Sequence, residues 1–167
     1  MLTQQHDWIK TLMERVAVSE GPARREAFSE LGRFLAAHEV AEEECLHLPG
    51  KKGLRDHTAV VDDRIDEEDG TREAIAELER LGTDSPHFPD VFAKFRAAVI
   101  AHAKAEEDEE LPTFDSAFED AEMIEVLHAL FQVPELASQN TQNGASFEDH
   151  VQAARAELGS DAPDADD

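Results

Sequence analysis

The hydrophobic residues of this chain recur every three or four positions, which is the period of helices that each bury one face. Alternating β-branched and polar runs, the pattern of half-buried strands, do not occur at useful length. Helix-breaking residues punctuate the sequence at Gly21-Pro22, Pro49-Gly50, Gly82 to Pro86 and Pro112. The stretches between them predict four helices, at residues 3–18, 23–47, 58–81 and 88–111.

Long helices joined by short connections are typical of an all-α, up-down-up-down four-helix bundle. A fifth, shorter helix is expected at about 118–131, from the spacing of Ala121, Ile124, Leu127 and Leu130. We therefore expect residues 1–133 to form one domain. Residues 134–167 are expected to be a flexible C-terminal extension, with one weak helix at 146–158 and disorder after it.

Each of the four main helices has an inward stripe that mixes apolar residues with residues able to bind a metal. The stripes are Leu2, His6, Ile9, Met13, Val16; Phe28, Leu31, Leu35, His38, Glu42, Cys45; Val61, Ile65, Glu68, Thr71 or Arg72, Ile75, Leu78; and Phe92, Phe95, Val99, His102, Glu106. Burying a carboxylate without a compensating charge costs on the order of several kcal/mol. A metal ion would supply that charge.

Two segments repeat one motif. Residues 38–44 and 102–108 both read H-x-x-A-E-E-acid, and each is followed by Leu-Pro. A four-residue step places His and Glu on the same helix face, where both can bind one metal. Similar intervals separate His6 from His38 and Glu68 from His102, so the chain has two halves of similar plan. The candidate metal ligands are His6, His38, Glu42, Glu68, His102 and Glu106.

Other motif interpretations fit less well. The zincin motif H-E-x-x-H would need a histidine where Glu42 stands. Ferritin-like bundles use E-x-x-H, with the carboxylate first and a shorter step. His57 lies on the same expected face as Glu68 and is an alternative ligand to it, while Cys45 is expected to be a small core residue and Trp8 to line the core or a pocket.

Composition and charge limit the partners and the cellular location that we expect. The net charge of −24 argues against nucleic acid and anionic membranes as partners, because phosphates would be repelled. A single cysteine forms no internal disulfide, and no apolar run is long enough for a membrane span or a signal peptide. We expect a cytoplasmic protein that is a monomer or a small homo-oligomer.

These residues resemble the hemerythrin-like family, the HHE cation-binding domains, over residues 1–115. The resemblance is carried by His6-Asp7, by the two H-x-x-x-E motifs with their Leu-Pro, and by the helix spacing. It implies two non-haem iron ions in a bundle core, bridged by Glu42, Glu106 and an oxo or hydroxo group. It further implies that His6 and His38 bind one iron and that His102 binds the other.

The chain departs from the family pattern at the third helix, where the family usually has a histidine and this sequence has Glu68. Anionic oxygen ligands favour ferric iron, so the extra carboxylate favours reaction with an oxidant over reversible O2 carriage. The expected function is a di-iron centre that binds or reacts with O2, peroxide or NO. A catalase-like peroxidase or oxidase, and an iron storage or sensing module, remain alternatives, as do Mn or Zn in place of iron.

Overall fold

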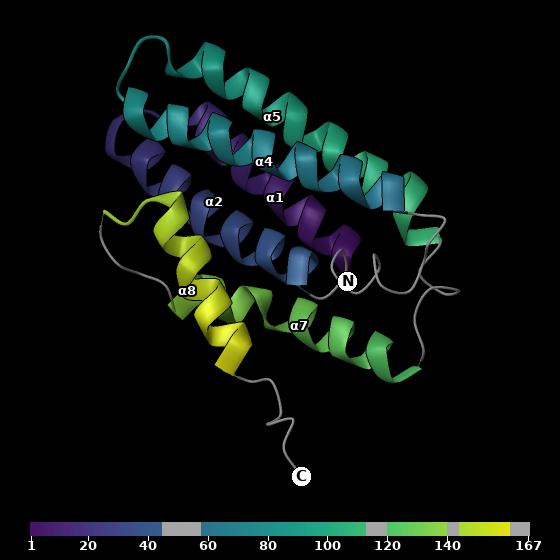
Figure 1. Ribbon diagram of the computed structural model, residues 1–167. Coiled ribbons are helices and arrows are strands. Elements are labelled where there is room, and N and C mark those ends of the chain that lie inside the picture. The colour runs from purple at the N-terminus through teal and green to yellow at the C-terminus, as the bar shows by residue number, and fades with distance from the viewer. Residues whose placement is uncertain (45–57, 113–119, 140–143, 161–167) are drawn as a thin grey trace.

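The computed structural model describes residues 1–44, 58–112, 120–139 and 144–160, and every regular element in these ranges is a helix (Figure 1). The elements are α1 (Leu2–Val18), α2 (Gly21–Glu42), α4 (Thr58–Leu81), α5 (Phe88–Ala105), the π-helical η2 (Glu106–Glu110), α7 (Asp120–Gln139) and α8 (Phe147–Ser160). The predicted all-α class is confirmed. None of these helices has the length and apolar character that a membrane span requires.

Helices α1, α2, α4 and α5 lie side by side and alternate in direction, as the sequence predicts (Figure 1). Helix α1 packs against α2 and α5, and α4 packs against α5. Two breakers act as expected: Pro22 occupies the first turn of α2, where a missing N–H costs nothing. Gly82 ends α4 with φ +78°, a conformation that favours glycine, and donates its N–H to the carbonyl of Leu78.

The inward stripes predicted for α1 and α5 form the core, together with the described parts of the α2 and α4 stripes. At the end of the bundle where α2 and α5 begin, Phe28, Phe88 and Phe92 pack together with ring centroids 5.4 to 6.4 Å apart. The polar members of the stripes gather toward the opposite end. Cys45 and the side chains of Val61 and Ile65 lie outside the described residues.

Helix α2 is enclosed on all sides over its last turns, where every residue from 34 to 42 is buried. The cause is a second layer of helices, since α7 and α8 both pack on the face of α2 turned away from the bundle core (Figure 1). The sequence did not predict this packing. The expected boundary at residue 133 falls inside α7, which continues through Pro134 to Gln139. Its apolar stripe also continues, since Val133 and Leu136 are buried.

Both helices predicted for this region, at about 118–131 and 146–158, are present as α7 and α8. Ile124 and Leu127 of the predicted stripe are nevertheless 67% and 43% exposed, because α7 turns a different face toward α2. Helix α8 packs against α2, although residues 134–167 were expected to be a flexible extension. Phe147 is buried, and its N–H donates to the Glu79 carboxylate of α4 at 2.6 Å, which fixes the start of α8.

The packing of α8 predicts that Phe147→Ala destabilises the protein by about 3–5 kcal/mol, the usual cost of removing a buried phenylalanine. Phe147 is 3% exposed, whereas Phe131 is 73% exposed and serves as the matched control. Urea unfolding should show Phe131→Ala within about 0.5 kcal/mol of the wild type. Equal stability of the two variants would mean that α8 contributes nothing to the fold.

Candidate metal centre

All six candidate ligands converge at one place inside the bundle. His6 comes from the first turns of α1, His38 and Glu42 from the end of α2, and Glu68 from α4. His102 lies in the last turn of α5, and Glu106 opens η2. Five of the six are buried, and His102 is nearly so, with 11% of its side chain exposed. Four helices, distant in sequence, thus supply one cluster.

The cluster consists of two overlapping groups that share a residue. One group is His6, His38 and Glu42; the other is Glu42, Glu68, His102 and Glu106. Within each group, one potential ligand atom from every residue lies within 4.8 Å of all the others. Each group therefore has the dimensions of a single-metal site, and Glu42 belongs to both.

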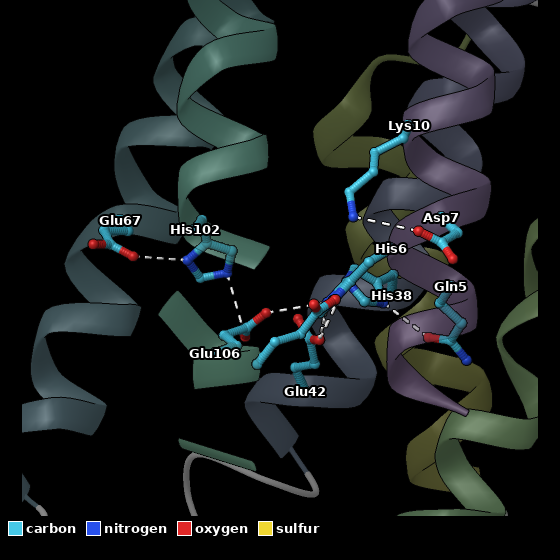
Figure 2. Close-up of polar contacts among 10 residues, drawn as sticks. Gln5, His6, Asp7, Lys10, His38, Glu42, Glu67, His102 and Glu106 are labelled. Carbon is cyan, nitrogen blue, oxygen red and sulfur yellow. Dashed lines mark hydrogen bonds and ion pairs between the residues drawn. The ribbon is translucent and has the colours of Figure 1, made fainter. Parts of the chain in front are cut away.

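Glu42 and Glu106 each lie between two histidines (Figure 2). Glu42 Oε1 is 3.2 Å from His38 Nε2 and 3.6 Å from His6 Nε2. The Oε2 atom of Glu106 is 3.2 Å from His6 Nε2, and its Oε1 atom is 3.4 Å from His102 Nε2. Glu106 spans two histidines with its two oxygens, which is the placement that a carboxylate needs to bridge two cations.

Every histidine of the cluster also has an outer partner at Nδ1. Glu107 lies 2.8 Å from Nδ1 of His6, and Glu67 lies 2.9 Å from Nδ1 of His102. The Oε1 atom of Gln5 lies 2.8 Å from Nδ1 of His38. In each case Nδ1–H donates outward, so that in the neutral imidazole the Nε2 lone pair points inward at a carboxylate. Metal-binding histidines are held in this way.

The inner atoms are poorly satisfied by the protein itself. Both oxygens of Glu42, together with Nε2 of His6 and of His102, are buried and form no hydrogen bond within the described part of the chain. A lone pair facing a carboxylate is repelled unless a cation or a proton lies between them. The donor set therefore fits a metal: imidazole nitrogens and carboxylate oxygens, preoriented and directed at one another.

The shifted pKa values of Glu42, His6 and His102 also show that positive charge is favoured in the cluster. Burial raises the pKa of Glu42 to about 7, and the neighbouring Glu106 adds to the effect. Burial alone would lower the pKa of His6 and of His102, but the carboxylates of Glu106 and Glu42 raise both to about 10. In the metal-free protein, protons on these imidazoles take the place of cations.

A partly buried ion-pair network that the sequence did not single out adjoins the cluster. Glu39 is buried, and both this burial and the charge of Glu68 raise its pKa. The guanidinium of Arg72 lies 3.4 Å from Glu39, 3.7 Å from Glu68 and 2.8 Å from Glu43. Glu43 in turn contacts Arg155 of α8 at 2.5 Å. Arg72 lies one turn after Glu68 on the same helix face, and that spacing was the available signal.

The two copies of the repeated motif differ in the role of the second glutamate. In the second copy, Glu107 accepts from His6, but its counterpart Glu43 pairs with arginines instead. The outer partner of His38 is the amide of Gln5, which precedes His6 as Glu67, the outer partner of His102, precedes Glu68. An acidic neighbour of a candidate ligand is a sequence signal for Glu67 and Glu107, whereas Gln5 is signalled only by its position beside His6.

Both copies of the motif end in π-helical geometry, at Glu43-Glu44 and at Glu106–Glu110. The sequence predicted an uninterrupted α-helix over 88–111. A π-turn holds one more residue than an α-turn, and such turns are frequent at functional sites. In η2 the consecutive residues Glu106 and Glu107 both reach His6, one at Nε2 and the other at Nδ1.

The family model of the hemerythrin HHE cation binding domain matches residues 1–114, which is more than half of the chain. The chain belongs to this HHE domain family. The match contains all six clustered residues and the outer partners of the three histidines. The buried His/Glu cluster is the candidate cation site of this cation-binding domain.

The fold of this HHE domain is similar to that of a solved structure. A hemerythrin HHE cation binding domain-containing protein from Mycobacterium kansasii aligns with a TM-score of 0.73 at 19% identity. The alignment covers 91% of this chain and 95% of the other, so the similarity in fold extends past residue 114. No curated protein matches the chain.

The raised pKa values predict that metal affinity increases with pH. The imidazoles of His6 and His102 hold protons up to about pH 10 and must release them before Nε2 can bind a cation. Between about pH 8 and pH 9, where Glu42 with its pKa of about 7 is already ionised, the logarithm of the zinc association constant should rise by up to about two per pH unit, one for each imidazole. Competition titrations with a chelator would measure this slope, and a constant independent of pH would contradict it.

Proposed function

We propose that this HHE domain is a non-haem di-iron protein that binds or reacts with O2, peroxide or a related small oxidant. The ligands are His6, His38, Glu42, Glu68, His102 and Glu106, with Glu42 and Glu106 shared between the two metals. The observation that carries the proposal is the pair of overlapping ligand groups with Glu42 common to both. Two such groups in a bundle core are the arrangement of two-metal carboxylate sites.

The charge of the cluster favours iron chemistry with oxidants. Iron bound here would supply electrons to an oxidant, and three carboxylates favour the ferric product. The chain's own groups orient the ligands: Glu107, Gln5 and Glu67 hold the three imidazoles at Nδ1. Manganese or zinc suits the same donor atoms, so the choice of metal is part of the proposal.

A small cavity beside the cluster supports a small ligand. Its volume is about 10 Å³, room for one water-sized molecule. Three candidate ligands line it together with apolar and polar side chains; the lining includes His6, His38, His102, Met13, Leu35, Val99, Lys10, Glu39 and Thr71. A cavity of this small volume favours a small ligand such as O2, peroxide or NO over an organic substrate.

The cavity also bears on the alternatives. An enzyme that uses peroxide as its only substrate fits this space, so a catalase-like activity is the second candidate function. An oxidase acting on an organic substrate would need electrons to reach the enclosed cluster from outside. Iron storage or sensing needs only the ligands and draws no specific support from the cavity.

Removal of the shared carboxylate should disrupt both metal positions. We expect the wild type, reconstituted anaerobically with ferrous iron and desalted, to retain about two iron ions per chain, and Glu42→Ala to retain fewer than one. Glu14, an exposed residue of α1 paired with Arg96, provides the control variant Glu14→Ala, which should match the wild type. Metal analysis by mass spectrometry gives the counts. Two iron ions in Glu42→Ala would refute the assignment of Glu42 to both sites.

Glu68→His tests whether the third carboxylate sets the reactivity. Replacing an anionic ligand with a neutral one should raise the iron reduction potential by on the order of 60 mV, a tenfold change in the one-electron equilibrium. The reduced wild type should oxidise when O2 is admitted, whereas Glu68→His should oxidise more slowly or show an absorbance band that reverses under vacuum. Identical potentials and oxidation rates in the two proteins would show that Glu68 has no such role.

A further inference from the structure

The side-chain amide of Gln5 joins the metal cluster to α7 through two hydrogen bonds. Its Oε1 atom lies 2.8 Å from Nδ1 of His38 (Figure 2). Its Nε2 atom donates to the backbone carbonyl of Leu130 at 2.5 Å, across 125 residues of sequence. Gln5 is 6% exposed, so this amide is satisfied by the protein and not by solvent.

The Leu130 carbonyl is available because of a proline. In an α-helix this carbonyl would accept from the N–H four residues later, but residue 134 is Pro134, which has no N–H. Gln5 supplies the missing donor. Since a carbonyl can only accept, the Gln5 amide must turn its nitrogen toward Leu130 and its oxygen toward His38.

This orientation fixes the tautomer of His38. An amide oxygen can only accept a hydrogen bond, so Nδ1 of His38 carries a proton and donates it in the hydrogen bond to Gln5 Oε1. The Nε2 atom of a neutral His38 then carries the lone pair that a metal would bind, on the side where Glu42 Oε1 lies 3.2 Å away. His6 and His102 are fixed in the same way by carboxylates, so His38 is distinct in having a neutral partner among these three.

We infer that Gln5 is a positioning residue of the metal centre, holding His38 with Nε2 directed at the metal and taking its own orientation from the carbonyl that Pro134 leaves open in α7. The inference rests on the proposed metal site and adds a role for α7, which lies beyond the residues matched by the family model. Helix α7 would thereby help to position a residue that holds a candidate metal ligand.

Two substitutions of Gln5 separate the two hydrogen bonds. Gln5→Met removes both bonds at similar side-chain volume, and zinc affinity should fall by about 10- to 100-fold, the usual effect of losing a partner of a metal-bound histidine. Gln5→Glu keeps an acceptor for His38 and gives it the kind of partner that His6 and His102 already have. Its carboxylate cannot donate to Leu130, so only the bond to α7 is lost.

The readouts are the zinc dissociation constant, from competition with a chromophoric chelator, and amide hydrogen exchange in α7. For Gln5→Glu we expect zinc affinity within about threefold of the wild type, together with faster exchange in α7. For Gln5→Met both properties should be impaired. The neighbouring Gln4 is exposed, so Gln4→Met is the matched control and should change neither.

Each outcome bears on a defined claim. Unchanged zinc affinity in Gln5→Met would overturn the positioning role, and so would equal losses of affinity in Gln5→Met and Gln5→Glu, because loosening of α7 alone would then account for them. Should Gln5→Met fail to fold, Gln5→Glu still decides between these explanations. A wild type that binds zinc at no concentration would overturn the metal centre itself and this role with it.

Discussion

The structure depends on the need of buried carboxylates for positive charge. Glu42, Glu68 and Glu106 are almost completely removed from water, and burial of unpaired charge costs on the order of several kcal/mol per group. Protons on His6 and His102 meet this need in the metal-free chain, and cations would meet it in the loaded protein. A bundle that carries this cost is organised around its centre and not only around its apolar contacts.

The charged groups around the cluster are unevenly distributed. At Nδ1, two of the three imidazoles are hydrogen-bonded to carboxylates, whereas His38 is hydrogen-bonded to a neutral amide. Arg72 neutralises part of the remaining acid at Glu39, Glu43 and Glu68. The two overlapping ligand groups are therefore electrostatically inequivalent, although the sequence motif that builds them is repeated. The chain reuses one helical motif and then varies the partners around it.

The four main helices and the six clustered residues could be predicted because both follow from a local period. Residues that continue an apolar stripe in steps of three and four share its helix face, so His38 and Glu42 could be placed in the core without coordinates. The pairing of each outer partner with its histidine could not be predicted, because Gln5 and Glu107 reach their histidines across 33 and 101 residues of sequence. Helices were expected near α7 and α8, but their packing on α2 was not, because the stripe through Ile124 and Leu127 faces outward and the buried face continues through Val133 and Leu136.

The π-turns have a consequence for the spacing of the sequence around the site. An α-helix rotates consecutive residues by about 100°, and the wider turn at Glu106–Glu110 reduces this rotation where Glu106 and Glu107 both reach His6. Loss of one residue there would let the backbone relax into regular geometry and swing all later side chains around the axis. In this stretch the number of residues matters as much as their identity, which makes insertions and deletions more damaging than many substitutions.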